Sequence, residues 1–370
     1  MITPPATLGV LGGGQLGRYF VMAARTMGYG TIVLEPDPHA PAGSVADEHL
    51  VAAFDDEVAL QHLATTCAVV TTEFENPPAA AMEWLARHTL VRPSPAAVAI
   101  TQDRRAEKAF LTRAGIAIAP YVVIETEGDI DAAASHSYPA ILKTARLGYD
   151  GKGQIVVKAH DRLAGAWHEL GRQPCVLEQR LDLQREVSVI LARSTSGQTA
   201  VYPVAVNSHV DGILDCTVVP HHAPGATELA EGVAAALDYV GVLAVEMFVV
   251  DGELLVNELA PRPHNSGHWT LDAARTSQFE QQVRAICGVG LGDPSLRSPA
   301  VAMVNLLGDL WAGGEPDWAA ALAEPEASLH LYGKRAPRSG RKMGHLTVTS
   351  STTDEAERLA RAIRRSLAPG

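Results

Sequence analysis

Cysteine is scarce in this sequence. Its 370 residues include only Cys67, Cys175, Cys216 and Cys287, which are widely spaced and form no CxxC pair. Disulfide scaffolds and zinc sites need clustered or regularly spaced cysteines, so this pattern argues against both. We expect reduced thiols that fill small positions in the core of a cytoplasmic protein.

Long apolar runs are also missing. The longest candidate, residues 240–250, is interrupted by Glu246. A spanning helix needs about 18 to 20 apolar residues, so no membrane span is expected. The first ten residues, MITPPATLGV, contain neither a basic segment nor a long apolar one. A signal peptide is therefore not expected.

Positive charge is in deficit, and lysine most of all. Lys and Arg total 30 against 42 Asp and Glu, a net charge of −12. This balance argues against a partner that is a nucleic-acid polymer or an anionic membrane. Any small anion must therefore be bound by a local cluster. The six lysines are Lys108, Lys143, Lys152, Lys158, Lys334 and Lys342.

The length suggests two or three domains, and the order of apolar runs suggests an α/β domain followed by α+β segments. In residues 1–100, expected strands at 8–11, 31–34, 69–71 and 90–92 alternate with helical patterns such as 15–27. Residues 101–290 are expected to hold helices at 103–114 and 226–240, strands at 140–144, 154–158, 175–178 and 186–192, and a hairpin of strands 243–250 and 254–259. Residues 291–370 are expected to hold strands at 301–307, 328–332 and 345–350 and a helix at 354–367.

A first glycine-rich segment, Gly12 to Gly17, fits GxGxxG between a strand and a helix, and Glu35 ends the second strand. This arrangement is typical of nicotinamide-dependent dehydrogenases, in which the acid binds a ribose. Small residues at a helix N-terminus also suit other anions, or simply a tight turn. The motif alone leaves the three interpretations open.

A second glycine-rich segment, residues 147–154, follows the strand that carries Lys143 and contains Lys152. Its three glycines allow the backbone to fold over phosphate oxygens, to which the lysines add charge. The GxxxxGK[ST] order of a Walker A loop is absent, and a plain flexible hairpin remains the alternative.

Glu246 and Glu258 lie on two strands that flank Asp251-Gly252. A two-residue turn would place Glu246 opposite Asn257, whereas a three-residue loop over 251–253 would place it opposite Glu258. Facing carboxylates repel unless a cation lies between them, and Mg²⁺ takes one or two carboxylates together with nucleotide phosphates. Two solvated acids at strand ends are the alternative.

Together these features resemble the ATP-grasp superfamily and, more closely, the 5-(carboxyamino)imidazole ribonucleotide synthetases of purine biosynthesis. The resemblance is carried in order by LGGGQLGR at 11–18, TTEFENPP at 71–78, GYDGKGQ at 148–154, NELAPRPHNSGHWT at 257–270 and GRKMGH at 340–345. It implies a Rossmann-like domain over 1–100, a central ATP-grasp domain over 101–290 and a small C-terminal domain over 291–370. It also implies a homodimer that binds ATP and Mg²⁺, or Mn²⁺ in its place.

The resemblance implies roles for individual residues. Those expected at ATP are Arg104, Lys143, Gly148, Tyr149, Asp150, Gly151, Lys152, Gly153, Gln154, Glu178, Gln179, Arg180, Leu181, Glu186, His209, Asn257 and Glu258. Glu246 and Glu258 are expected to carry the metal. Ala260 stands where ATP-grasp enzymes often have an asparagine, so a third side-chain ligand stays open. Those expected at the ribonucleotide are Gln15, Leu16, Glu73, Asn265, Lys334, Arg341 and Lys342.

The implied reaction joins bicarbonate to the amine of 5-aminoimidazole ribonucleotide, with phosphoryl transfer from ATP. Its expected catalytic residues are Lys143, Arg262 and Lys334. His268, Tyr149 and the released phosphate remain open as acceptors of the amine proton. The alternatives are a formate-dependent glycinamide ribonucleotide transformylase and, from another class, an NAD-dependent dehydrogenase that uses Gly12 to Gly17.

Overall fold

A parallel sheet forms the N-terminal part of the computed structural model, which describes residues 1–148 and 151–367. Its strand order is β3-β2-β1-β4, and β1 and β4 are almost wholly buried, as expected for a parallel sheet covered on both faces. The expected strand at 90–92 is reduced to one bridge between Val70 and Val91. The elements are β1 Thr7–Leu11, α1 Gln15–Thr26, β2 Gly30–Leu34, β3 Glu48–Leu50, α2 Glu57–Thr66, β4 Val69–Thr72, α3 Ala79–His88, α4 Pro95–Thr101 and α5 Arg104–Arg113.

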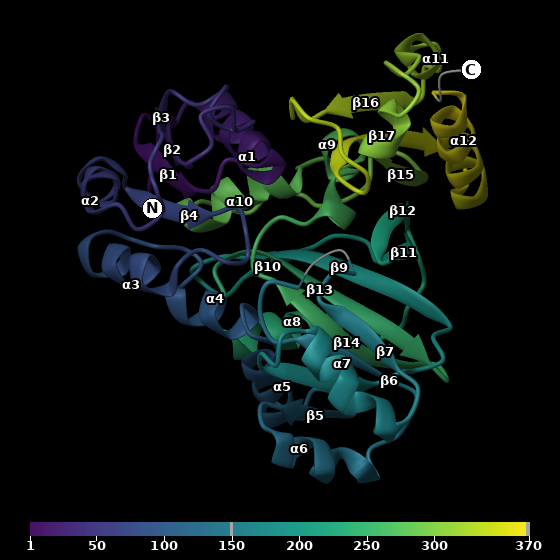
Figure 1. Ribbon diagram of the computed structural model, residues 1–370. Helices are drawn as coiled ribbons and strands as arrows, with labels where there is room; N and C mark the ends of the chain where they lie inside the picture. The colour runs from purple at the N-terminus through teal and green to yellow at the C-terminus, as the bar shows by residue number, and fades with distance from the viewer. Residues whose placement is uncertain (149–150, 368–370) are drawn as a thin grey trace.

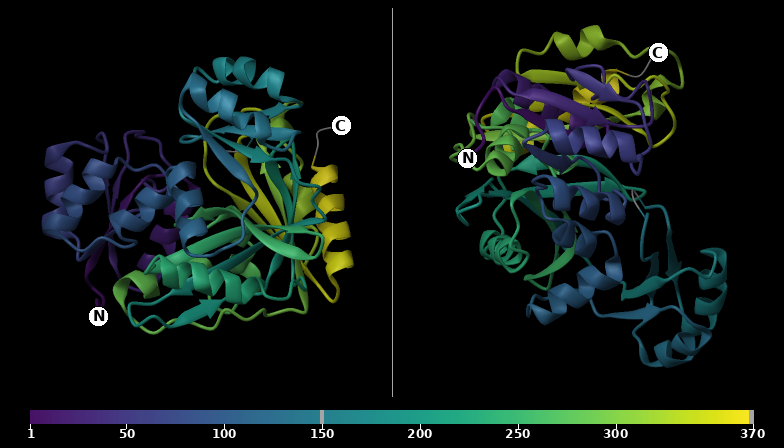
Figure 2. Two further views of the ribbon diagram at one scale, coloured as in Figure 1. Left: turned by 90° about the horizontal axis from the view of Figure 1, so that it is seen from below. Right: turned by 90° about the vertical axis from the view of Figure 1, so that its left-hand side faces the viewer.

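A small antiparallel lobe follows, with strand order β5-β8-β6-β7. Helices α6 and α7 pack on it around Trp167. Figure 2 shows this lobe projecting away from the N-terminal sheet. Its elements are β5 Tyr121–Ile124, α6 Glu127–Ala132, η1 Ala133–Ser135, β6 Ala140–Thr144, β7 Gln154–Val157, η2 His160–Arg162, α7 Leu163–Glu169 and β8 Cys175–Gln179.

A large antiparallel sheet connects the middle of the chain to its end. Its order is β14-β13-β9-β11-β12-β15-β17-β16, with β10 paired to β9. The sheet continues past residue 290 because β12 pairs with β15, and α12 covers β15 and β17 (Figure 1). The elements are β9 Arg185–Arg193, β10 Thr199–Val201, β11 Ala205–Val210, β12 Ile213–Val219, α8 Ala226–Ala236, β13 Gly241–Val250, β14 Glu253–Ala260, η3 Asn265–Gly267, α9 Thr270–Ala273, α10 Gln278–Cys287, β15 Ala300–Leu307, η4 Gly308–Trp311, α11 Trp318–Leu322, β16 Ala327–Leu331, β17 Lys342–Ser350 and α12 Thr353–Ser366.

Helix α8 is shorter than the expected helix over 226–240. Asp238 has φ 44°, and the N–H of Tyr239 closes onto the carbonyl of Ala234. This left-handed turn ends the helix and buries Tyr239 completely.

Helices α1 and α10 lie side by side although more than 250 residues separate them in sequence (Figure 1). Gln282 of α10 connects the two sheets: its Nε2 donates to Thr71 Oγ1 at 2.9 Å, and its Oε1 accepts from Val242 N at 2.6 Å. Strand β4 of the N-terminal sheet is thereby connected to β13 of the central sheet.

The four cysteines are free and buried, which confirms their expected place in the core. Over the part of the chain that the structure describes, the search for a helix long and apolar enough to cross a membrane found none.

Candidate active site

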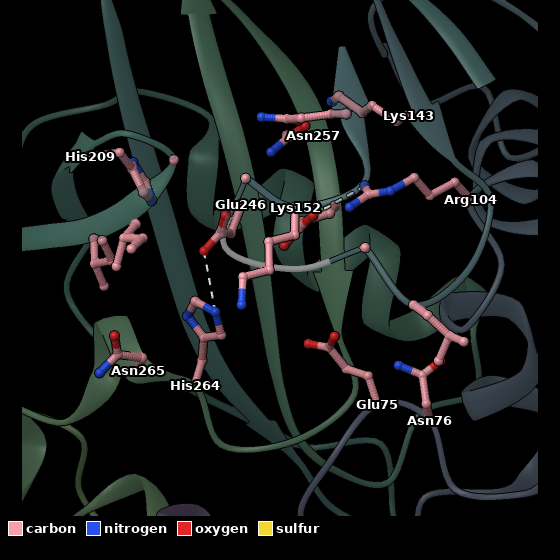
Figure 3. Close-up of a pocket in the computed structure, with 18 of the residues that line it drawn as sticks. Glu75, Asn76, Arg104, Lys143, Lys152, His209, Glu246, Asn257, His264 and Asn265 are labelled. Atoms are coloured by element: carbon pink, nitrogen blue, oxygen red, sulfur yellow. Dashed lines mark hydrogen bonds and ion pairs between the residues drawn. The ribbon is translucent and has the colours of Figure 1, made fainter. Parts of the chain in front are cut away.

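A cavity of about 800 Å³ lies where the three parts meet. Its walls come from the start of α1, from the loop after β4, from β6 and β7 of the small lobe, from strands β13 and β14, and from the segment between β16 and β17. Figure 3 shows side chains from these separate segments pointing toward one space.

Glu246 and Glu258 face each other across β13 and β14. The turn between these strands has two residues, not the three on which that pairing was expected to depend. The extra residue is Asn257, which forms a bulge and shifts the register by one. The predicted pair is therefore present, but for a different reason.

The electrostatics of the pair are those of a cation site. Burial and the neighbouring Glu258 raise the pKa of Glu246 to about 8. Burial acts in the same direction on Glu258, but Arg104, whose Nη1 is 3.2 Å from Glu258 Oε2, outweighs it together with Lys143 and Arg262, so the pKa of Glu258 is lowered. A cation between the two carboxylates would lower the pKa of Glu246 and so allow both to be ionised at neutral pH.

Lys143 is held by Glu178 at the cavity wall. Its Nζ lies 2.7 Å from Glu178 Oε2, and the fully buried Lys108 lies 3.3 Å from Glu178 Oε1. Burial would raise the pKa of Glu178, but the two lysines hold it at about 2. Glu178 therefore keeps two ammonium groups inside the protein, and only Lys143 lines the cavity.

The second glycine segment lines the cavity with Gly148, Gly151, Lys152 and Gln154. Gly153 has φ 74°, and a Cβ there would lie 2.7 Å from Thr144 Oγ1, so this position requires glycine. Two further expected ATP contacts, Tyr149 and Asp150, lie outside the described residues.

His209 and Glu186 form an ion pair on the opposite wall, with Nδ1 2.8 Å from Oε2. Burial lowers the pKa of His209, but the bond to Glu186 outweighs this and raises it. A partly positive imidazole suits a phosphate, which is the role expected for His209.

The C-terminal segment brings Lys334, Arg341 and Lys342 to the cavity, as expected, and Arg338 as well. Lys334 Nζ donates to the carbonyl of Lys342 at 2.8 Å, which holds both ends of the segment together. Asn265 also lines the cavity, with its amide paired to that of Asn305.

The first glycine loop does not offer an open anion site. Both Glu73 oxygens accept from the first turn of α1, at 3.0 Å from Gly14 N and Gly17 N, and Glu35 Oε2 accepts from Gly13 N at 2.9 Å. The backbone N–H groups that a dehydrogenase would offer to the phosphates of its cofactor are thus already bonded to carboxylates, and Glu35, which would bind the ribose, is one of these partners. The dehydrogenase alternative is therefore wrong.

Sequence comparison covers all three parts. The family model of the ribonucleotide synthetase preATP-grasp domain matches residues 5–102, that of the ATP-grasp domain residues 109–279, and that of the phosphoribosylaminoimidazole carboxylase C-terminal domain residues 301–359. N5-carboxyaminoimidazole ribonucleotide synthase from Brucella melitensis is 47% identical over 94% of this chain and 97% of its own length. The chain belongs to the N5-carboxyaminoimidazole ribonucleotide synthase family.

Solved structures agree with this family. An ADP complex of N5-carboxyaminoimidazole ribonucleotide synthetase matches with a TM-score of 0.92 and 41% identity over 98% of this chain and 97% of that one. The Aspergillus clavatus synthase with ADP and 5-aminoimidazole ribonucleotide matches with a TM-score of 0.88 and 31% identity, over 98% of each chain. The expected ATP-grasp fold is confirmed.

The residues around the glutamate pair fit a magnesium ion. Besides the two carboxylates, the cavity is lined by Asn257, whose Oδ1 is buried with no hydrogen-bond partner. Mg²⁺ prefers oxygen ligands of these kinds. Asn257 thus offers the third side-chain oxygen that Ala260 does not.

Several expected contacts do not line the cavity. Glu73 accepts from backbone N–H groups at the start of α1. Residues 178–181 lie outside the cavity lining, which instead includes the apolar side chains of Ile141, Leu183 and Phe248. An adenine contact through 178–181 stays a prediction. His268, one of the groups considered for the amine proton, is fully buried and outside the lining.

Sequence reasoning missed Glu75, Asn76 and His264, which all line the cavity. Glu75 forms an ion pair with Arg262, and His264 Nε2 lies 3.3 Å from Glu246 Oε1. Glu75 lies two residues after Glu73 in the same motif, and only the path of the loop after β4 decides which acid reaches the cavity. Burial, aided by Arg262, lowers the pKa of His264 well below its usual value.

Outside the cavity, Asp272, His330 and His345 bring three potential metal-ligand atoms within 4.8 Å of one another. The rings of His330 and His345 are stacked, with centroids 4.4 Å apart and planes 12° from parallel. Imidazole binds metals through a lone pair in its own plane, and two parallel planes do not meet at one ion. We therefore interpret this group as a packed cluster between α9, β16 and β17.

Proposed function

We propose that this chain uses ATP and Mg²⁺, or Mn²⁺, to join bicarbonate to the amine of 5-aminoimidazole ribonucleotide. The observation that carries the proposal is one cavity with two cationic regions. Lys143 and the glycine segment line this cavity together with Lys334, Arg341 and Lys342. The charge of Lys143 acts on Glu258, whereas that of Lys342 acts on Glu246. Two phosphate-bearing ligands can therefore meet there with their reacting groups adjacent.

The chemistry requires activation of bicarbonate, because hydroxide is a poor leaving group. Transfer of the γ-phosphoryl group to bicarbonate gives carboxyphosphate, an acid anhydride that can deliver its carbon to the amine. The metal would neutralise charge on the phosphates. Lys143 would offset the charge of the transferring group, Lys334 would orient the ribonucleotide, and Arg262 would hold the oxyanion that derives from bicarbonate.

Glu75 would keep Arg262 in place for this step. The ion pair between them anchors the guanidinium at the junction of the N-terminal loops and the central sheet. Gln15 and Leu16 at the start of α1 line the cavity and would provide contacts to the ribonucleotide. The Aspergillus clavatus relative was solved with ADP and that ribonucleotide, which supports binding of the same ribonucleotide by this chain.

The proposal is tested by phosphate release from ATP in four mixtures, in which bicarbonate or formate is paired with aminoimidazole or glycinamide ribonucleotide. We expect release only with bicarbonate and the aminoimidazole nucleotide. Release with formate and the glycinamide nucleotide would support the transformylase alternative and overturn the proposal.

Lys342→Ala is expected to raise KM for the ribonucleotide about 10- to 100-fold, the value of a lost hydrogen bond to a charged group, with kcat within about threefold. The bond from Lys334 to residue 342 uses the main-chain carbonyl and survives the substitution. Lys158→Ala, at an exposed position outside the cavity, is the matched control. A fall in kcat as large as the expected rise in KM would show that Lys342 acts in the chemical step instead.

Family membership also supports proposals on the oligomeric state, the location and the domain limits of this chain. We propose a homodimer, a cytoplasmic location and domain limits near residues 100 and 290. Size-exclusion chromatography with light scattering tests the first of these, and a monomer at micromolar concentration would contradict it.

A further inference from the structure

His264 lies beside Glu246 on the cavity wall, directly before η3 (Figure 3). Its Nε2 is 3.3 Å from Glu246 Oε1. On the other side of the ring, Nδ1 is 3.3 Å from the backbone N of Ser266 and 2.9 Å from Ser266 Oγ. Both ring nitrogens therefore have partners.

The backbone partner determines where the imidazole hydrogen is. A backbone N–H can only donate, so His264 Nδ1 must accept from Ser266. In a neutral imidazole the hydrogen then lies on Nε2, which donates it to Glu246. A cavity-facing nitrogen that already carries hydrogen cannot take up the amine proton, so His264 is not the general base.

A buried row of polar side chains reinforces this direction. Thr217 Oγ1 donates to Asn207 Oδ1, Asn207 Nδ2 donates to Ser188 Oγ, and Ser188 Oγ donates to Ser266 Oγ, each at 2.9 Å. Ser266 is left to donate to His264 Nδ1. All the bonds therefore point toward Glu246, and bonds that point the same way strengthen one another in a low-dielectric interior.

The row is built into the sheet. Ser188 on β9 is the cross-strand partner of Glu246 on β13, and Asn207 on β11 is the partner of Thr217 on β12. Ser188, Ser266 and Thr217 are at most 1% exposed. Since water does not reach these hydroxyls, their orientation depends on one another rather than on solvent.

We infer that His264 is a positioning residue for Glu246, with its Nε2–H holding Oε1 so that the other carboxylate oxygen is presented to a divalent cation. The row of Thr217, Asn207, Ser188 and Ser266 fixes the imidazole tautomer that makes this possible. The inference rests on the proposed metal role of Glu246. Residues that hydrogen-bond to a metal-binding side chain, without touching the metal themselves, set the orientation of that side chain.

The tautomer can be read from the full chain without metal or nucleotide. We expect the ¹H–¹⁵N correlation spectrum of imidazole-labelled protein to show His264 as the Nε2–H form, with its signals assigned by their loss in His264→Gln. An Nδ1–H form, or an imidazolium at neutral pH, would overturn the inference whether or not the chain binds a metal.

Mn²⁺ binding in the presence of ADP, followed by electron paramagnetic resonance, tests the consequence. His264→Leu removes the donor and is expected to weaken Mn²⁺ binding about 10- to 100-fold. His264→Gln keeps an N–H near the same place and should stay within about threefold of the unmodified chain, and Ser188→Ala should lose about two- to tenfold.

Ser194→Ala is the matched control, because Ser194 is a buried serine just after the other end of β9, bonded to Ser196. Its Mn²⁺ binding should not change. Equal binding by His264→Leu and the unmodified chain would overturn the inference. No binding by the unmodified chain would overturn the proposed metal site and this inference with it, and the tautomer measurement distinguishes the two failures.

Discussion

Glu258→Gln is expected to reduce phosphate release by at least about 10³-fold, because a metal that stabilises transferring charge is worth several kcal/mol. The substitution keeps the size of the side chain and removes its charge. Arg104 then loses the carboxylate that lies 3.2 Å away, and Glu246 loses the partner with which it would hold the cation. Both effects act on the phosphates of bound ATP rather than on the fold.

Steady-state phosphate release and Mn²⁺ binding measured on the same preparation test this prediction. Glu253→Gln, an exposed position at the start of the same strand, is the control and should leave both unchanged. Turnover within about tenfold of the unmodified chain would show that the metal does not depend on Glu258.

Glu178→Gln is expected to lower the free energy of unfolding by about 3 to 5 kcal/mol, the cost of leaving a buried charge without its partner. The carboxylate serves two ammonium groups, on Lys108 and Lys143, which are 0% and 11% exposed at the side chain. An amide cannot neutralise either. The folded-state pKa of Glu178, about 2, lies below its ordinary value. Its contribution is therefore complete above that ordinary value and is lost as pH falls through about 2, so pH 7 is the condition to compare.

Urea unfolding followed by circular dichroism measures this loss. Glu169→Gln, at an exposed position in the same lobe, is the control. Adding Lys108→Met to Glu178→Gln removes one unpaired charge and should restore part of the stability. A double variant no more stable than Glu178→Gln would show that the cost does not come from unpaired lysines.

Most secondary structure followed from local pattern. The hairpin around Asp251-Gly252 and the strand that carries Lys143 were predicted within one or two residues, because alternating burial and turn chemistry act over short distances. What the sequence did not predict has tertiary causes. Glu73, which was expected at the ribonucleotide, accepts from two backbone N–H groups at the start of α1, because the chain after β4 brings its carboxylate there. Its contact with the ribonucleotide stays a prediction.

Most of the few lysines lie at or near the cavity. Lys143, Lys152, Lys334 and Lys342 line the cavity, as their placement in two glycine-rich or basic segments indicated. Lys108 showed no such signal, since it sits in an ordinary amphipathic helix. Its burial against Glu178 appears only when α5 packs beneath the sheet.

By itself the sequence determined most of the elements, the two groups of cations that line the cavity and the identity of the two glutamates, because each depends on residues close together in the chain. Tertiary structure decided how those glutamates meet. The bulge at Asn257 is stabilised from α5, where Lys108 Nζ donates to the carbonyl of Asn257 at 3.0 Å and Glu107 accepts from Leu259 N at 2.7 Å. These partners lie about 150 residues away in sequence. A bulge held by so distant a helix leaves no local pattern in the strand, and it is this bulge that places Glu258 opposite Glu246.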